Sequence, residues 1–437
     1  MRIPGPKPFT PVHGPGHACA TLRPVPIPAD PIAMDPAPPT EVTRLLARAR
    51  AGQSAWFTVD DSAIDGTAQL VAEVTRDRYG DRAIPYHSRW RHFEAGGIDR
   101  RAELDALLGP IDAAERARTQ IDLTVVSVLL DAGAGADWRY LEAESGQHFA
   151  RSEGLGVASL RAFTAGLFSS EAGTPLRVDA AGLRAVTTDA LARAFQVSAN
   201  NPLVGLEGRV TLLRRLGDAL ASQPAVFPGV ARPGALFDRL CAGGQIGVAA
   251  HDVPHVQAHD VLVALLDTLS EVWPAPNRLS DGTALGDCWR FAAARGEGAS
   301  DGWMPFHKLS QWLTYSLLEP FEWAGVPVHG LDALTGLPEY RNGGLLLDAG
   351  VLQPQNPAWV THAWQPGDEL VVEWRALTVA LLDELAPRVR KPLGLTVAQM
   401  PLACVLEGGT WAAGRVLAQR LRGGTPPLNI ASDGTVF

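Results

Sequence analysis

Apolar residues recur every three or four positions along several stretches of the chain, which is the spacing of one face of an α-helix. The clearest pattern covers residues 369–385 and comprises Leu370, Trp374, Leu377, Leu381 and Leu385. Similar spacing predicts helices over residues 110–130, around residues 160–167, over residues 183–197 and within residues 304–320. Pro110 suits the first turn of the helix predicted over residues 110–130.

Strand patterns are few. Residues 55–59 (AWFTV) and residues 344–348 (GLLLD) are the strand candidates. We find no tandem repeat and no alternation of strand and helix patterns, which disfavours a doubly wound sheet. The sequence therefore predicts a mainly α, multihelical globular fold with minor β structure.

Residues 1–40 have a different character, because they contain the proline-rich runs PGPKPF, PVHGPG, PVPIP and PAPP. Proline fixes φ and removes a backbone donor, so we expect a disordered or loosely attached tail here. Met34 is a candidate start of translation beside Met1. Residues 41–437 are expected to form a single large helical catalytic domain, and their length is compatible with two lobes.

Composition narrows the classes of protein. The chain has 437 residues, of which 46% are hydrophobic and 19% charged, as in a soluble globular protein with a large core. A net charge of -9 would repel a polyanion, so no nucleic-acid partner is expected. No apolar run approaches the ~20 residues that span a bilayer, and the N-terminus lacks the apolar core of a signal peptide. The cysteines are far apart and form no CxxC pair, which indicates reduced thiols in a cytoplasmic protein without membrane contact.

Candidate chemistry is concentrated first in residues 84–100, IPYHSRWRHFEAGGIDR. Pro85 disfavours a helix through its start and the glycine pair ends it, so the helical part is short. Guanidinium groups match phosphate or carboxylate in a bidentate way, imidazoles carry protons near neutral pH, and a carboxylate can pair with an arginine. The candidates are Arg89, Arg91 and Arg100 for an anion, His87 and His92 for protons, and Glu94. The alternative is a buried ion network that ties two helices together.

A second group lies in residues 334–352, LTGLPEYRNGGLLLDAGVL. Glycines allow the backbone to approach a ligand closely, and a carboxylate can stabilise an oxocarbenium-like centre or orient a water. The candidates are Glu339, Tyr340, Arg341, Asn342 and Asp348. The alternative is a tight turn with a capping Asn, followed by a buried strand that ends at Asp348.

A third segment, residues 304–320, is mostly an apolar helix face, but His307 and Lys308 lie at its expected N-terminal end and could line a pocket. A lone histidine is more often a satisfied structural one. The spacing of His251, His255 and His259 would suit zinc on one helix face, yet Pro254 interrupts the helix and no cysteine or HExxH glutamate accompanies them. We therefore expect neither a metal nor a cofactor.

Several unusual motifs occur together in one order, namely IPYHSRWRHFEAGGIDR, VSANNPLVGLEGR, LGDCW, PFHKLSQWLTYSLLEP, LTGLPEYRNGGLLLD and the terminal SDGTVF. In these motifs, from about residue 51 to the C-terminus, the chain resembles the Urc/Urg family of uracil-catabolism accessory proteins, a former domain of unknown function. The proline-rich tail and the run of histidines do not belong to that pattern.

The resemblance implies pyrimidine breakdown through a ring-opened nucleotide. Uracil is made into its ribose phosphate, a cyclohydrolase-like partner opens the ring, and a ribosylurea-type compound loses urea. We expect the protein to hydrolyse that N-glycosidic bond, with a nucleotide-derived small molecule as substrate and other uracil-catabolism enzymes as partners. The alternatives are an amidohydrolase that cuts a ureido carbonyl, or a non-catalytic partner of the ring-opening enzyme.

Roles for the candidates are our own hypothesis. Asp348 or Glu339 would stabilise the sugar cation or activate water, His87 or His92 would protonate the leaving nitrogen, and arginines would hold the phosphate. The Leu-x-Gly hairpin and trailing Asp in residues 334–352 also resemble helix-hairpin-helix nucleobase glycosylases, although Pro338 and Glu339 stand where the second hairpin glycine is expected.

Overall fold

The structure is a computed structural model that describes residues 39–243, 255–273, 277–279, 282–295 and 301–431. Within these residues the fold is mainly helical, and its strands form small two-stranded sheets, as the sequence predicts. None of the described helices is long and apolar enough to cross a membrane. A relation to helix-hairpin-helix glycosylases stays a prediction.

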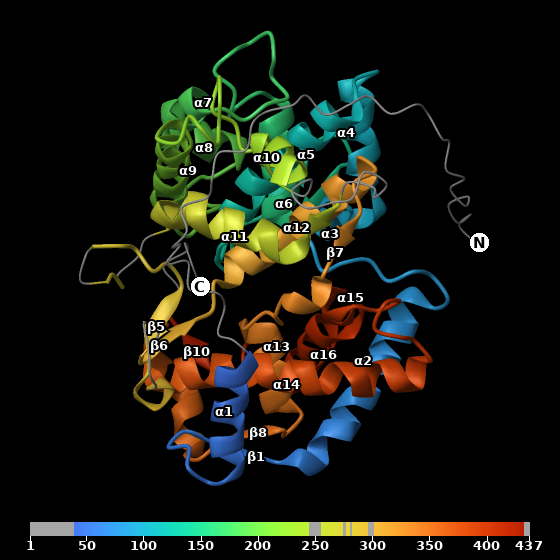
Figure 1. Ribbon diagram of the computed structural model, residues 1–437, viewed down its shortest axis with the longest axis vertical. Coiled ribbons are helices and arrows are strands. Elements are labelled where there is room, and N and C mark those ends of the chain that lie inside the picture. Colours follow the sequence, from blue (N-terminus) through green and yellow to red (C-terminus); the bar gives the residue numbers. More distant parts are fainter. Residues whose placement is uncertain (1–38, 244–254, 274–276, 280–281, 296–300, 432–437) are drawn as a thin grey trace.

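Figure 1 shows two groups of helices, one above the other. The upper group, which we call the central lobe, uses the middle of the chain: α3 (Trp90–Phe93), α4 (Arg100–Leu108), α5 (Ala113–Leu129), β2 (Tyr140–Glu142), β3 (Gln147–Phe149), α6 (Arg151–Thr164), α7 (Ala180–Ala185), α8 (Thr188–Ala194), α9 (Leu206–Ala221), α10 (Ala235–Gly243), β4 (Val256–Gln257), α11 (Ala258–Leu269), α12 (Lys308–Trp323) and β7 (Val328–His329).

The lower group, the terminal lobe, combines both ends of the described chain. Its elements are α1 (Pro39–Arg50), β1 (Phe57–Val59), α2 (Ile64–Tyr79), β5 (Cys288–Arg290), β6 (Trp303–Pro305), α13 (Tyr340–Asp348), β8 (Leu352–Pro354), β9 (Ala363–Trp364), α14 (Glu369–Leu393), α15 (Leu402–Val405), the π-helix Leu406–Thr410, α16 (Trp411–Arg422) and β10 (Asn429–Ile430). The chain enters the central lobe after α2, visits the terminal lobe for β5 and β6, goes back to the central lobe for α12 and β7, and then ends in the terminal lobe.

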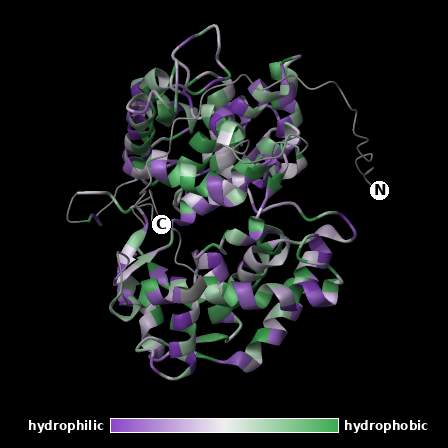
Figure 2. Ribbon diagram, in the orientation of Figure 1, coloured by the Kyte–Doolittle hydropathy of each residue, from purple (hydrophilic) through white to green (hydrophobic). Residues whose placement is uncertain are grey.

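Amphipathic helices account for both lobes. Hydrophobic and hydrophilic residues alternate along most helices in Figure 2, and the apolar faces are buried. The predicted helix at residues 110–130 is confirmed as α5, which begins where Asp112 caps its N-terminus by accepting a hydrogen bond from Glu115 N. The predicted helix at residues 369–385 is confirmed as α14, which runs on to Leu393 and packs against α1, α2 and α13.

Two predictions of secondary structure need correction. The helix expected over residues 183–197 is divided into α7 and α8, because the side chain of Thr187 accepts a hydrogen bond from Ala190 N and starts a new helix. The strand expected at residues 344–348 is wrong, since these residues end α13, which Glu339 caps. The strand at residues 55–59 is confirmed over a shorter length as β1, which pairs antiparallel with β8.

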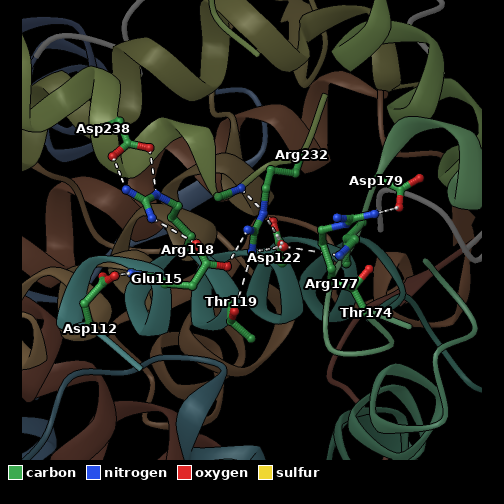
Figure 3. A network of polar contacts seen from close by, with 12 residues as sticks. Asp112, Glu115, Arg118, Thr119, Asp122, Thr174, Arg177, Asp179, Arg232 and Asp238 are labelled. Carbon is green, nitrogen blue, oxygen red and sulfur yellow. Dashed lines mark hydrogen bonds and ion pairs between the residues drawn. The ribbon is translucent and has the colours of Figure 1, made fainter. Parts of the chain in front are cut away.

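A buried ion network fixes α5 within the central lobe (Figure 3). The fully buried Asp122 accepts hydrogen bonds from the Arg232 guanidinium at 2.9 Å and from Gly234 N at 2.7 Å. Arg118, one turn earlier on α5, forms two hydrogen bonds of 2.8 Å with Asp238 of α10. These contacts tie α5 to α10, and α5 in turn carries the loop that reaches the site described below.

Candidate functional site

A cavity of about 450 Å³ lies between the two lobes. We call it the interlobe cavity. The central lobe and the segment before it supply His87, His92, residues 131–135, Arg151, Ser152, Lys308 and Trp312, and the terminal lobe supplies Leu337, Glu339, Tyr340, Arg341, Trp411 and residues 423–426. The volume falls in the range of sites for small-molecule ligands. All three segments with candidate chemistry, residues 84–100, 304–320 and 334–352, therefore line the same cavity.

Three helices begin at this cavity. Arg151 is the first residue of α6, Lys308 of α12 and Tyr340 of α13, and each of them lines the cavity. The chain turns sharply before two of these helices, since Arg151 has a φ of 54° and His307 a φ of 46°, values that non-glycine residues rarely adopt. A helix N-terminus carries a partial positive charge and favours an anion. At α13 the carboxylate of Glu339 already takes this place.

Arg341 is a buried cation at the cavity, and two of its donor atoms have no acceptor. Its side chain is buried, its guanidinium lies 4.8 Å from the centre of the Tyr340 ring, and its Nε and Nη1 atoms donate no hydrogen bond. A buried donor without an acceptor costs roughly 1–3 kcal/mol. Such a cost is explained if the acceptor is a ligand.

Lys308 is half-buried at the start of α12, and its backbone N–H donates to Asp287 Oδ2 at 3.0 Å. Burial and the neighbouring Arg375 lower the pKa of the Lys308 amine, while Asp287, Glu339 and Asp131 oppose that shift. Asp287 is held in turn by two hydrogen bonds from Arg375, of 2.7 and 2.6 Å. Lys308 thus lies among carboxylates in a position fixed by a buried ion pair.

Two carboxylates line the cavity from opposite lobes, Glu339 and Asp131. Glu339 accepts hydrogen bonds from Arg341 N at 2.7 Å and Asn342 N at 2.5 Å, which caps α13. Burial raises the pKa of Glu339, although these two N–H groups and Lys308 lower it in part. Asp131 follows α5 and pairs with Arg89, whose Nη1 lies 2.9 Å from its Oδ1.

His87 forms a dyad with a carboxylate. Its Nδ1 lies 2.8 Å from Oε2 of Glu407, and its backbone N–H donates to Ala403 O. Burial opposes the charge of Glu407, but the hydrogen bond and charge of His87, together with Arg78, outweigh burial and lower the pKa of Glu407 to about 2. A carboxylate on one ring nitrogen orients the imidazole and leaves its other nitrogen for a substrate, which is the arrangement of a general acid or base.

Glu407 lies in the π-helix Leu406–Thr410, between α15 and α16. π-Helical turns are rare and frequently occur at functional sites. Gly409 allows this turn to contact α2, because a Cβ atom there would approach Val71 O to 2.4 Å. Thr410 donates to Asn342 Oδ1 at 2.9 Å, which joins the turn to α13. The π-helix therefore supplies both the partner of His87 and a contact to the α13 wall.

His92 is the second histidine at the cavity. Burial, and then the charge of Arg89, lower its pKa to about 4, so its ring is neutral at neutral pH. The ring meets Trp312 edge to face at 5.5 Å, and Nδ1 has no hydrogen-bond partner. Trp312 belongs to the central lobe and Trp411 to the terminal lobe, and their ring centres lie 6.4 and 6.1 Å from that of His87.

Other candidates from residues 84–100 do not line the cavity. Arg89 is fully buried and donates to Ser127 at 2.6 Å. Arg91 pairs with Glu319 at 2.7 Å and with Glu94 at 3.1 Å. These pairs form the buried ion network that was the alternative interpretation of the segment. Arg89 still acts on the cavity indirectly, because it holds Asp131.

Three further candidates lie behind the cavity wall. Asn342 is buried and donates to Leu337 O at 3.2 Å, and His307 is buried at the position that precedes α12. Asp348 ends α13, where its carboxylate accepts a hydrogen bond from Arg422. The roles of these residues stay predictions, but Glu339 is the carboxylate of that segment that reaches the cavity.

Sequence reasoning did not select Asp131 and Glu407. Asp131 stands in DAGAGAD directly after a predicted helix, and a lone acid before a glycine-rich loop was the available signal. Glu407 directly precedes the glycine pair of GGTWAAGR, and nothing in the local sequence marks it as the partner of a histidine.

The histidine run shows no metal-like arrangement in the part that is described. Among the described residues no group of three or more His, Cys, Asp or Glu side chains could hold a metal ion. His251 lies outside the described residues. His259 belongs to α11, and the ring of His255 stacks on that of His329 at 4.7 Å.

Comparison with known proteins matches residues 40–437 to the family described as "Protein of unknown function (DUF1688)". "Protein urg3" of Schizosaccharomyces pombe (strain 972 / ATCC 24843) is 39% identical over 402 residues, which cover 90% of this chain and 95% of the relative. "Uracil catabolism protein 4" of Lachancea kluyveri is 39% identical over 420 residues, which cover 88% of this chain and 93% of the relative.

Proposed function

The chain belongs to the DUF1688 family, and from that premise we propose that it acts in uracil catabolism, the process for which one of its relatives is named. We propose further that it hydrolyses the N-glycosidic bond of a ribosylurea-type nucleotide, which yields urea and ribose phosphate. The observation that carries this proposal is that the cations, carboxylates and histidines of distant segments line one interlobe cavity.

The phosphate would bind beside Arg341 and near the starts of α6 and α12. Arg341 has two buried donors without acceptors, and Arg151 and Lys308 stand at the first positions of those two helices. A guanidinium matches two phosphate oxygens at once, and helix N-termini add N–H groups and a favourable dipole. Arg89 and Arg91 are not part of this clamp, since their charges are paired with Asp131 and Glu319.

The reaction breaks the bond between C1 of the ribose and the urea nitrogen, whose electron pair leaves with the nitrogen. His87, held by Glu407, would give its proton to that nitrogen. Glu339 would stabilise the positive charge that develops on the sugar and take a proton from the attacking water. Burial raises the pKa of Glu339, which makes its carboxylate a stronger base than an exposed one. The indoles of Trp312 and Trp411 offer flat walls for a planar ureido group.

The test is incubation of the purified protein with synthetic ribosylurea 5-phosphate, followed by mass spectrometry of the products. The proposal expects urea and ribose 5-phosphate in equal amounts. Release of ammonia or a carbamate would instead indicate an amidohydrolase that cuts the ureido carbonyl. No turnover by the protein alone, with complex formation on addition of the ring-opening enzyme, would indicate a non-catalytic partner.

A further inference from the structure

Asp131 is a carboxylate that pairs with a buried arginine and also lines the interlobe cavity. It lies directly beyond α5 in a loop, residues 131–135, that lines the interlobe cavity, and its side chain is 10% exposed. Oδ1 is buried and lies 2.9 Å from Arg89 Nη1, so the ion pair occupies that oxygen. The ion pair therefore holds the carboxylate in place and leaves the second oxygen, Oδ2, to face a ligand in the cavity.

The position of Asp131 is set by two buried arginines. Arg89 is fixed by its own hydrogen bonds to Ser127 Oγ at 2.6 Å and Ser152 O at 3.3 Å, so it cannot follow a shift of the carboxylate freely. Arg209, also fully buried, donates to Leu130 O at 3.1 Å and Ala132 O at 2.7 Å. The loop is thus clamped on both sides of Asp131.

Arg209 also orients the peptide groups of the loop. It contacts the carbonyls of Ala132 and Gly133. The N–H of a trans peptide points opposite to its C=O, so the N–H groups of Gly133 and Ala134 point away from Arg209. The loop consequently combines a fixed carboxylate with backbone donors directed away from its clamp, as a site for a polyhydroxylated ligand requires.

An ionised carboxylate can only accept hydrogen bonds, and two of its lone pairs match the two hydroxyls of a vicinal diol. We propose that Asp131 selects ribose, by accepting hydrogen bonds from the 2- and 3-hydroxyls of a ribose phosphate whose phosphate lies at the Arg341 side of the cavity. This inference rests on the proposed function in taking the ligand to be a ribose phosphate. Asp131 would determine sugar specificity, a role that neither the leaving-group chemistry nor the phosphate clamp supplies.

Calorimetric titration of the full chain with ribose 5-phosphate and with 2-deoxyribose 5-phosphate tests this. Loss of one hydrogen bond to a charged group corresponds to roughly a 10- to 100-fold weaker affinity, so we expect the ribose compound to bind tighter by about that factor. Asp131→Asn keeps an oxygen for Arg89 and should reduce the preference to about 3-fold or less. Asp137→Asn, an exposed acid further along the same loop region, is the matched control and should keep the full preference.

Equal affinity of the wild-type protein for the two sugar phosphates would overturn the inference, as would failure to bind either, whatever the variants do. An undiminished preference in Asp131→Asn would overturn it as well. These results are distinct from failure of the proposed function. Preferential binding of ribose 5-phosphate without release of urea would remove the hydrolase and leave Asp131 as a ribose-selecting residue.

Discussion

Replacement of Arg341 by methionine separates a binding role from a structural one. Methionine keeps an apolar stem of similar length and removes the charge. Two buried donors without acceptors cost about 1 kcal/mol each at least, and the stack on Tyr340 at 4.8 Å returns about 1 kcal/mol. We therefore expect Arg341→Met to leave the ligand-free protein as stable as the wild type, or more stable by about 1 kcal/mol.

The matched control is Arg100→Met, because Arg100 is equally buried but fully paired. Its guanidinium donates to Glu142 at 2.7 and 2.6 Å and to the carbonyls of Phe93 and Ala95. Its removal takes two hydrogen bonds from the buried Glu142, to which Arg161 and Ser145 still donate, and costs about 3 kcal/mol. Urea unfolding of the two variants should thus give changes of opposite sign or at least of very different size.

Ligand completes the experiment. Ribose 5-phosphate at 100 times its dissociation constant should stabilise the wild-type protein by about 2.7 kcal/mol. If Arg341→Met weakens binding roughly 100-fold, the same concentration should stabilise the variant by only about 0.4 kcal/mol. A variant that is destabilised as strongly as Arg100→Met, yet keeps the ligand effect, would refute the assignment of Arg341 to the phosphate.

Three further predictions concern the other groups at the cavity. His87→Asn should lower kcat by roughly 10²- to 10⁴-fold with KM little changed, and Glu407→Gln should do so to a smaller extent, as steady-state kinetics on ribosylurea 5-phosphate would reveal. Glu339→Gln should abolish most turnover while Asp348→Asn retains it, and the reverse order in the same assay would return the carboxylate role to Asp348. His92 has a pKa of about 4 in the folded chain and 6.5 ordinarily, so between these pH values the unfolded chain binds a proton that the folded chain does not. The free energy of unfolding should therefore fall by about 3 kcal/mol as the pH drops from 6.5 to 4. Urea unfolding should show a flatter pH dependence in His92→Gln, and an unchanged dependence would count against a neutral buried ring.

The helices were predictable because their apolar period is strong. Residues 110–130 and 369–385 correspond to α5 and α14, whose buried faces follow the spacing in the sequence. The failures are local. At residues 344–348 a short apolar run fits strand or helix equally, and the cap provided by Glu339 decides for the helix.

From the sequence one could predict which chain segments contribute to a site, but not which of their side chains line the cavity. Proline and glycine mark residues 84–100 and 334–352 as irregular, and irregular segments at helix ends reach the boundary between the lobes. The direction of each side chain depends on tertiary contacts. Arg89 therefore turns towards Asp131, while His87 and His92, its near neighbours in the chain, line the cavity.

The ion-pair and hydrogen-bond partners of the candidate residues could not be predicted from the sequence. Glu407 lies 320 positions from His87 along the chain, and nothing local links a glutamate before a glycine pair to a distant imidazole. Asp131 becomes notable only when Arg89 and Arg209 are seen to fix it. A single sequence gives residue types at the site, whereas the ion pairs that hold them follow from the packing of the two lobes.

The central claim is that the interlobe cavity holds a ribose phosphate. A crystal structure of the protein with ribose 5-phosphate tests it most directly. The account predicts the phosphate within hydrogen-bond distance of the Arg341 guanidinium, near the starts of α6 and α12, and the sugar hydroxyls facing Asp131. A ligand bound at another surface, or an interlobe cavity without ligand at a saturating concentration, would contradict it.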